Sequence, residues 1–254
     1  MFINSRIKNN IEDKGINVFF KNHVSSTNDY LKYKYINDIA PIVIMTNNQR
    51  YPRGRRGSSW INYHCHSLSF TLCLKFEGNV NNYKTLSYIV GISILEVCKE
   101  FNIKSLKLKW PNDIMIDGKK VCGILIENNI INKNLFFSAI GVGFNISIPD
   151  KLLNLIDGNV DNLNIRSDKL ETLIPKLIQQ IITNTHLLKD NGFSSFKEKC
   201  NKYMYAKNEN ILLKNNLDEI TGKLLGIDED GCLEIDTKHG TKKINTLDYS
   251  LRVL

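Results

Sequence analysis

The chain has 254 residues, a formal net charge of +8 and an isoelectric point of about 9.1. Its 42% hydrophobic and 24% charged residues are typical of a globular protein with a sizeable core. The charge favours anionic partners, but the lysines are scattered, which is weak support for nucleic-acid binding. There is no signal-peptide pattern and no apolar run of membrane-spanning length, so we expect a soluble, cytoplasmic protein.

The cysteines are spread over the chain without a CxxC pair, a pattern that predicts reduced, mostly buried thiols. The triplet His64-Cys65-His66 could hold a metal only through alternate members, because consecutive strand residues point to opposite faces. We therefore do not expect a metal site there.

Residues 1–15 are polar and are expected to be irregular. Residues 16–20 are typical of a strand. A helical pattern then runs through Lys34, preceded by Ser26 and Thr27, which are good N-cap residues. Their hydroxyls either cap the helix alone or also hold a polar ligand together with the free N–H groups at the helix start.

Residues 42–45 predict a buried strand that leads into a loop over residues 49–60, Gln-Arg-Tyr-Pro-Arg-Gly-Arg-Arg-Gly-Ser-Ser-Trp. We call this segment the arginine loop. Its glycines and proline disfavour a helix or strand, and its four arginines repel one another unless an anion lies among them. Together with the flat face of Trp60, this composition suits a nucleotide. The alternative is a solvated basic loop.

Alternating residues 68–74 predict a strand, and the spacing over 84–101 predicts an amphipathic helix packed on the sheet. A strand over 106–110 stops at Pro111 and is expected to resume at 114–116. Asp117-Gly118 indicates a hairpin to a return strand over 121–127. A last strand over 135–145 contains Gly141 and Gly143, which permit a close approach of other groups to the backbone.

Residues 168–189 predict a helix with Ser167 as its cap, in which Pro175 predicts a kink or a break. A shorter helix is expected over 193–203. From residue 211, four or five short strands with tight turns predict a small β-barrel. The expected domains are residues 1–205 and residues 206–254.

Four motifs now stand together: Ser26-Thr27-Asn28, the arginine loop, Lys109-Trp110-Pro111-Asn112-Asp113 through Lys120 and Gly123, and Gly141-Val142-Gly143-Phe144-Asn145. From about residue 20 to the end, the chain closely resembles the biotin–protein ligases. The resemblance implies an α+β fold: a mixed sheet with packed helices, like class II aminoacyl-tRNA synthetases, and a small C-terminal Src-homology-3-like barrel. Too few residues precede Ser26 for the family's DNA-binding repressor domain, so we expect a form without it.

The activity implied by the resemblance is the ATP-dependent ligation of biotin to a carrier. Biotin and ATP form biotinyl-5'-AMP and pyrophosphate, and a lysine of a biotin carboxyl carrier protein or domain then displaces AMP. The expected substrates are biotin and ATP, with Mg²⁺, and no DNA or membrane partner is expected. The sequence leaves the oligomeric state open between monomer and homodimer.

Individual roles follow by resemblance. The catalytic residues are expected to be Arg55, Lys120 and Lys109. The biotin-binding residues are expected to be Ser26, Thr27, Asn28, Gln49, Arg53, Gly54, Arg55, Lys120 and Gly123. The ATP-binding residues are expected to be Arg56, Trp60, Lys109, Asn112, Asp113 and Asn145. Asp113 either coordinates Mg²⁺, directly or through water, or orients Lys109 or a backbone amide.

Two departures from the family pattern stand out in the arginine loop. Pro52 replaces a glycine, and Ser58-Ser59 replaces residues that are often basic. The loop is expected to be mobile without ligand and ordered with it. The competing functions are a lipoate–protein ligase of the same fold and a non-catalytic nucleic-acid-binding module; the loop and the barrel favour biotin, and no DNA-reading helix is visible.

Overall fold

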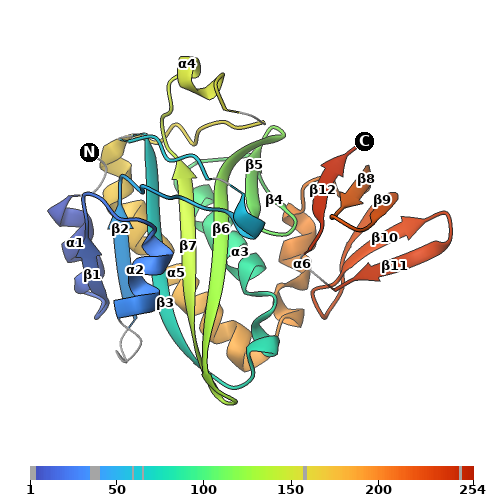
Figure 1. Ribbon diagram of the computed structural model, residues 1–254, viewed down its shortest axis with the longest axis horizontal. Helices are drawn as coiled ribbons and strands as arrows, with labels where there is room; N and C mark the ends of the chain where they lie inside the picture. Colours follow the sequence, from blue (N-terminus) through green and yellow to red (C-terminus); the bar gives the residue numbers. More distant parts are fainter. Residues whose placement is uncertain (1–3, 35–40, 59, 65, 157–158, 246–247) are drawn as a thin grey trace.

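The computed structural model describes residues 4–34, 41–58, 60–64, 66–156, 159–245 and 248–254. Two sheets organise this part of the chain, a large mixed sheet with packed helices and a small antiparallel sheet beside it (Figure 1). The α+β class expected from the sequence is confirmed. The helices are α1 (Ser5–Glu12), α2 (Thr27–Lys34), α3 (Leu86–Glu100), α4 (Asp150–Leu153), α5 (Ser167–Asn191) and α6 (Ser194–Tyr203), with short 3-10 turns η1 (Arg55–Gly57) and η2 (Val80–Tyr83).

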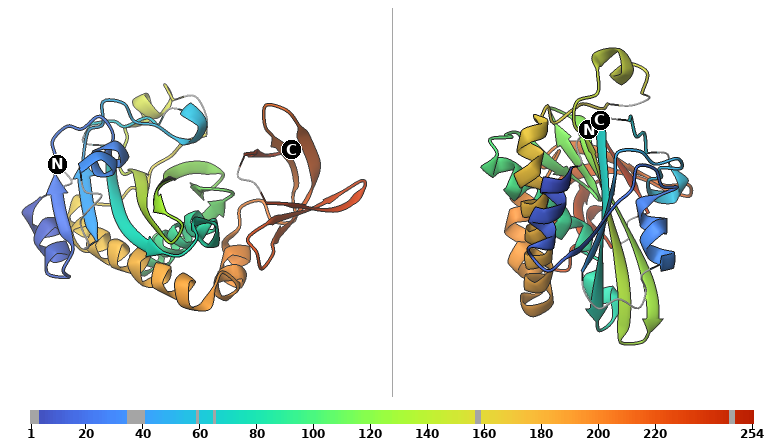
Figure 2. Two further views of the ribbon diagram at one scale, coloured as in Figure 1. Left: turned by 60° about the horizontal axis from the view of Figure 1, so that its bottom comes forward. Right: turned by 90° about the vertical axis from the view of Figure 1, so that its left-hand side faces the viewer.

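The large sheet has the strand order β1-β2-β3-β7-β6-β5-β4. The pair β1–β2 is parallel and the other neighbours are antiparallel. Figure 2 shows α1 and α5 on one face of this sheet and α2 on the other. The strands are β1 (Asn17–Phe20), β2 (Ile42–Thr46), β3 (Ser67–Glu77), β4 (Leu106–Lys109), β5 (Asp113–Ile116), β6 (Lys119–Asn132) and β7 (Leu135–Asn145).

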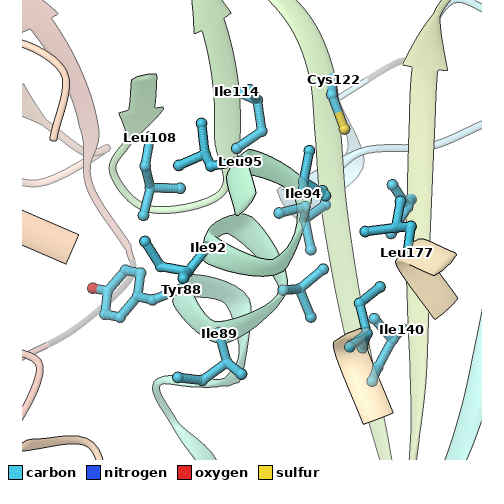
Figure 3. Packing of buried hydrophobic residues seen from close by; sticks show 14 of the residues in the cluster. Tyr88, Ile89, Ile92, Ile94, Leu95, Leu108, Ile114, Cys122, Ile140 and Leu177 are labelled. Atoms are coloured by element: carbon cyan, nitrogen blue, oxygen red, sulfur yellow. The ribbon is translucent and has the colours of Figure 1, made fainter. Parts of the chain in front are cut away.

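Helix α3 lies at the centre of the main core, between the sheet and α5. The prediction that it is amphipathic is wrong, because both its sides are covered and even Ser87 and Ser93 are buried. Figure 3 shows its residues Ile89, Ile92 and Ile94 among side chains of the strands and of α5. Each fully buried aliphatic side chain of this kind contributes about 1.5–3 kcal/mol to folding. The surrounding residues labelled there are Leu108, Ile114, Cys122, Ile140 and Leu177.

The period-2 alternation of the strands separates a core face from an open face. On β3, Phe70 and Leu72 point into the main core, while Ser69 and Thr71 point to the face that carries α2. On β7, Val142 belongs to the main core between two glycines. Small and polar residues therefore leave space on the α2 face of the sheet. The candidate site described below lies in this space.

Three other expectations are corrected. Within the segment expected to be irregular, residues 5–12 form α1, which Asn4 caps and whose Ile7 and Ile11 are fully buried. The chain does not continue in one direction past Pro111, since β4 and β5 form an antiparallel pair. Pro175 does not break α5, which runs on to Asn191, and Ser167 is the first residue of that helix rather than its cap.

The small sheet has the order β11-β10-β9-β8-β12 and is antiparallel throughout. This agrees with a Src-homology-3-like fold. It joins the large sheet beside β4, where the Tyr205 N–H donates to the Leu108 carbonyl (2.9 Å), and Tyr88 of α3 donates to the Gly231 carbonyl (3.3 Å). The strands are β8 (Asn210–Lys214), β9 (Glu219–Ile227), β10 (Leu233–Thr237), β11 (Gly240–Ile244) and β12 (Ser250–Val253).

Five of the six cysteines are described, and each is a free, buried thiol, as the sequence predicted. Burial raises the pKa of Cys98 to about 12 and that of Cys73 to about 11, which leaves both thiols protonated at neutral pH. Cys65, the middle of the His-Cys-His triplet, lies outside the described residues. Among the described helices, none is long and apolar enough to cross a membrane.

Candidate active site

One row of residues crosses five strands on the open face of the large sheet. The register pairs Ser69 of β3 with Gly143 of β7, Gly143 with Gly123 of β6, Gly123 with Asp113 of β5, and Asp113 with Lys109 of β4. Directly paired residues share a face of a sheet. Segments distant in sequence therefore place a hydroxyl, two bare backbone positions, a carboxylate and an ammonium side by side. This row is the floor of a cavity of about 500 Å³.

Two glycines of β7, Gly141 and Gly143, are required by close contacts. A Cβ atom on Gly143 would lie 2.6 Å from the ring of Trp60, and one on Gly141 would lie 2.5 Å from Oδ1 of Asn28. Real Cβ atoms do not approach so closely. The two glycines of the 141–145 motif thus make room for an indole from the arginine loop and for a carboxamide from α2.

At one end of the cavity lies a group of uncharged polar side chains, Ser26, Thr27, Gln49 and Ser69, which we call the polar end. Gln49 Oε1 accepts from the Thr27 N–H (2.9 Å) and from its hydroxyl (3.2 Å), and Gln49 Nε2 donates to Ser69 Oγ (3.1 Å). The acceptor at the start of α2 is therefore a side chain from the arginine loop, which satisfies one orphan N–H of the helix. The same Gln49 side chain therefore caps α2 and forms part of the polar end.

Beside the polar end, Arg53 is held by two carboxylates. Its guanidinium donates to both oxygens of Asp29 on α2 (2.5 and 2.7 Å) and to both oxygens of Glu127 on β6 (2.8 and 3.0 Å). We call these three residues the Arg53 clamp. Hydrogen bonding to Asp29 above all, against some desolvation, raises the pKa of Arg53. Both terminal nitrogens of the guanidinium therefore donate to protein carboxylates.

Positive charge gathers at the other end of the cavity, which we call the cationic end: Arg55, Lys109 and Lys120 around Asp113. Lys120 Nζ lies 2.7 Å from Asp113 Oδ1 and 5.5 Å from the Trp60 ring centroid. Desolvation by burial lowers the pKa of Lys109, and the charge of Lys120 lowers it further, although Asp113 opposes this. Desolvation and the neighbouring Arg56 likewise lower the pKa of Arg55. One carboxylate thus faces three cations.

The turn between β4 and β5 fixes the cationic end. Asn112 accepts from Arg55 Nη1 at Oδ1 (3.2 Å) and donates from Nδ2 to the Ile124 carbonyl (2.7 Å), tying the turn to the loop and to β6. Behind it, the hydroxyl of Ser87 on α3 donates to the Pro111 carbonyl (3.0 Å). The buried start of α3 therefore supports the turn that carries Asn112 and Asp113.

The small sheet closes the cavity on the cationic side. Tyr249, Ser250 and Leu251 line it, and Arg56 forms an ion pair with Asp248 (4.0 Å). Arg56 and Gly57 both adopt positive φ (52° and 73°), the left-handed region that favours glycine. These two residues turn the loop past the cavity towards the C-terminal sheet.

The structure brings together every candidate residue except Asn145 along the lining of this cavity. Asn145 ends β7 and donates from Nδ2 to the Asp161 carbonyl (3.1 Å), so it holds the segment beside Lys120, and its contact with nucleotide stays a prediction. Ser59 lies outside the described residues. Sequence reasoning missed Ser69 and the stretch 249–251. The alternation over 68–74 signalled Ser69, but no local pattern signalled the C-terminal stretch.

Comparison with models of known families matches residues 20–145 to one described as "Biotin/lipoate A/B protein ligase family". These residues make up just under half of the chain. They contain the arginine loop, the 109–113 turn, Lys120 and the glycine floor, so the matched family domain supplies nearly the whole cavity.

Relatives extend the likeness beyond the matched family domain. Among solved structures, the biotin protein ligase from Aquifex aeolicus in complex with biotin and ATP is 27% identical with a TM-score of 0.75, covering 94% of this chain and 99% of that one. The bifunctional ligase/repressor BirA of Bacillus subtilis is 24% identical over 94% of this chain and 75% of its own length. A biotin–[acetyl-CoA-carboxylase] ligase of Paracoccus denitrificans is 23% identical over 75% of this chain and 82% of its own length.

Proposed function

We propose that this protein is an ATP-dependent ligase that activates biotin as biotinyl-5'-AMP and transfers it to a lysine of a biotin carboxyl carrier protein or domain. The observation that carries the proposal is a single cavity with an uncharged polar end and a cationic end on one glycine floor. This arrangement matches a ligand whose neutral polar ring binds at the polar end. Its anionic tail would then lie at the cationic end, where it reacts with a phosphate. The solved complex of the Aquifex aeolicus relative contains biotin and ATP.

The polar end suits the ureido ring of biotin, which offers one carbonyl acceptor and two N–H donors. Ser26 and Thr27 supply hydroxyls, which can donate or accept, and Gln49 and Ser69 complete the group. All of these side chains are neutral, so they recognise the ring without attracting the carboxylate of biotin to this end. The carboxylate then points along the floor to Lys120.

The cationic end suits adenylate formation. A carboxylate oxygen of biotin attacks the α-phosphorus of ATP, a new P–O bond forms, and the bond to pyrophosphate breaks. Two anions must approach each other, and Arg55, Lys109 and Lys120 would screen their repulsion and stabilise the charge that develops. Holding both substrates in line supplies the rest of the acceleration, so no covalent nucleophile is required of the protein.

In the second step, the neutral amine of the carrier lysine attacks the carbonyl carbon of the mixed anhydride. An amide bond forms, AMP leaves, and the amine releases its proton. The cations that screened the phosphate in the first step would stabilise AMP as the leaving group. The overall reaction forms a carbon–nitrogen bond and converts ATP to AMP and pyrophosphate.

For the nucleotide, Trp60 offers a flat apolar face for adenine. Its indole Nε1 is buried against Gly143 and has no hydrogen-bond partner in the described part of the chain. Asn112 and Arg56 complete the lining on this side. We include both in the ATP site.

The residues present fit Mg²⁺ that arrives with the nucleotide. Among the described residues, no group of three or more His, Cys, Asp or Glu could hold a metal ion, and Asp113 is the carboxylate of the cavity floor. Mg²⁺ keeps several waters and needs few protein carboxylates when phosphates supply the other ligands. Asp113 would therefore hold the ion, directly or through water, and the ion would neutralise phosphate charge.

The proposal includes the division into a catalytic domain over residues 1–205 and a C-terminal domain over 206–254, action in the cytoplasm, and a carrier protein as partner. The decisive experiment incubates the protein with ATP, a biotin carboxyl carrier domain and labelled biotin or labelled lipoate. We expect biotin to label the carrier lysine and lipoate not to do so. Labelling by lipoate alone would assign the chain to lipoate ligation instead.

A further inference from the structure

The Arg53 clamp joins three segments that are far apart in sequence, α2, β6 and the arginine loop. Asp29 takes both terminal nitrogens of the guanidinium, and Glu127 takes Nη2 with both of its oxygens. All three side chains are about one-third exposed. Bidentate Arg–carboxylate pairs are the geometrically most specific ion pairs in proteins. A loop held in this way has one position relative to the sheet.

Buried neighbours orient the clamp in turn. Asn28 donates from Nδ2 to Glu127 Oε2 (2.8 Å) and to the Leu125 carbonyl (3.3 Å), and its Oδ1 accepts from Thr71 Oγ1 (2.6 Å). Asn28 is 3% exposed and lies against Gly141. Its hydrogen-bonding capacity is therefore spent on holding Glu127. Asn28 and Arg53 nevertheless line the cavity, and their direct contact with biotin stays a prediction.

The backbone next to the clamp is also fixed. The Arg50 N–H donates to the Val24 carbonyl (2.8 Å) and the Tyr51 N–H to the Ser25 carbonyl (2.9 Å), so the loop enters paired with the segment that precedes α2. Pro52 fixes its own φ between this pairing and Arg53. Residues 50–53 are thus fixed by backbone bonds at one end and by two carboxylates at the other, next to the polar end of the cavity.

We propose that Asp29 and Glu127 are positioning residues which act through Arg53 to hold the first half of the arginine loop in its substrate-binding position before any ligand arrives. The inference rests on the proposed function, because it concerns the same cavity. Ligand-dependent ordering is then confined to residues after Gly54, where Arg55 and Arg56 meet the cationic end. Pre-organisation of this kind increases affinity by removing the cost of ordering the loop on binding.

The test uses the full chain and four variants: the isosteric Asp29→Asn and Glu127→Gln, the charge-removing Arg53→Met, and Glu127→Gln combined with Arg53→Met. Two readouts are taken without ATP: the Kd for biotin and the rate of tryptic cleavage at the Arg50–Tyr51 bond. The matched control is Glu12→Gln on α1, which neutralises a carboxylate paired with Lys8 (3.6 Å) far from the cavity. Thermal unfolding of each variant reports whether it is folded.

We expect Asp29→Asn and Glu127→Gln each to weaken biotin binding about tenfold and to speed cleavage by a similar factor, since bonds to charged groups are among the stronger ones but these are partly exposed. The control leaves both readouts unchanged. In the Arg53→Met background, Glu127→Gln has less than about a twofold further effect, because the guanidinium is already gone and a glutamine oxygen still accepts from Asn28. A full additional loss in the double variant would show that Glu127 acts without Arg53 and would overturn the proposal.

Unchanged cleavage and unchanged Kd in both carboxylate variants would overturn it as well. Failure of the proposed function is distinguishable, because wild-type protein that does not bind biotin still reports on the clamp through cleavage at Arg50. If one carboxylate variant unfolds, the other still tests the Arg53 clamp, since both carboxylates bind the same guanidinium.

Discussion

The two ends of the cavity differ in how their polar groups are paired. At the polar end, Gln49, Thr27 and Ser69 hydrogen-bond one another, and the adjoining Arg53 is matched by two carboxylates. At the cationic end, Arg55 and Lys109 have lowered pKa values because they are desolvated close to other cations. The first end is built to be complete without ligand. The second concentrates positive charge that an anionic ligand would stabilise.

This difference indicates where binding energy is used. In the proposed function, a pre-organised polar end would give affinity and orientation, since little has to move when a neutral ring binds. The desolvated cationic end would contribute to catalysis, because its charges interact most strongly when negative charge builds up between them. Changes at the polar end should therefore act on biotin affinity, and changes at the cationic end on the rate of adenylate formation.

The largest effect is expected from substitutions that remove a cation from the cationic end. Arg55→Ala or Lys120→Ala should reduce adenylate formation by about 10²–10³-fold, by analogy with the loss of a charge-stabilising donor at an active site. Biotin-dependent pyrophosphate release measures it. Lys119→Ala is the matched control, because the neighbouring lysine on β6 pairs with Asp161 instead (3.4 Å). Unchanged release in both active-site variants would refute these roles.

A pair of glycine substitutions separates the two ends. Gly141→Ala should displace Asn28 and raise the KM for biotin, while Gly143→Ala should displace Trp60 and raise the KM for ATP. Each effect should be about tenfold, because overpacking costs about 1–3 kcal/mol. Steady-state kinetics with each substrate varied in turn distinguishes them. If both variants changed the same KM, the assignment of ends to substrates would be wrong.

A pH profile tests the electrostatics of the cationic end. Lys109 must be charged to screen phosphate, and its pKa lies below the ordinary lysine value because of desolvation. The rate of pyrophosphate release should therefore fall as the pH rises through that lowered pKa, at a pH below about 10.4, where a free lysine titrates. Lys109→Arg keeps its charge and should move this alkaline limb upward. A limb that stayed in place would show that another group titrates.

The smallest effect is expected at the contact between the loop and the C-terminal sheet. Asp248→Asn should change the KM for ATP by less than about threefold, because an exposed ion pair contributes only about 0–1 kcal/mol. The pair with Arg56 is long (4.0 Å) and exposed. Initial rates at varied ATP concentration measure the change, and an effect as large as that of Lys120→Ala would mean that the C-terminal sheet takes part in catalysis.

Much of the architecture follows from local patterns. Strand alternation, the Asp117-Gly118 turn and the short C-terminal strands predicted most elements, because period-2 burial and positive φ are local properties. Errors arose where tertiary contacts decide the outcome. Helix α1 has only Ile7 and Ile11 as apolar anchors and depends on α5, and the polar residues of α3 are buried because α5 covers its second side.

The sequence by itself determined the chemical inventory of the site, since glycine-rich arginine loops, the Lys-Trp-Pro-Asn-Asp turn and the paired glycines carry their chemistry locally. Only the tertiary structure decided which of these side chains line one cavity and which protein groups they bond. Strand register aligns Ser69 with Asp113 and Lys109, and packing commits Arg53 and Asn28 to Glu127. The physical reason is that hydrogen-bond partners from distant segments compete with a ligand for the same donors, and this competition is visible only when those segments are assembled.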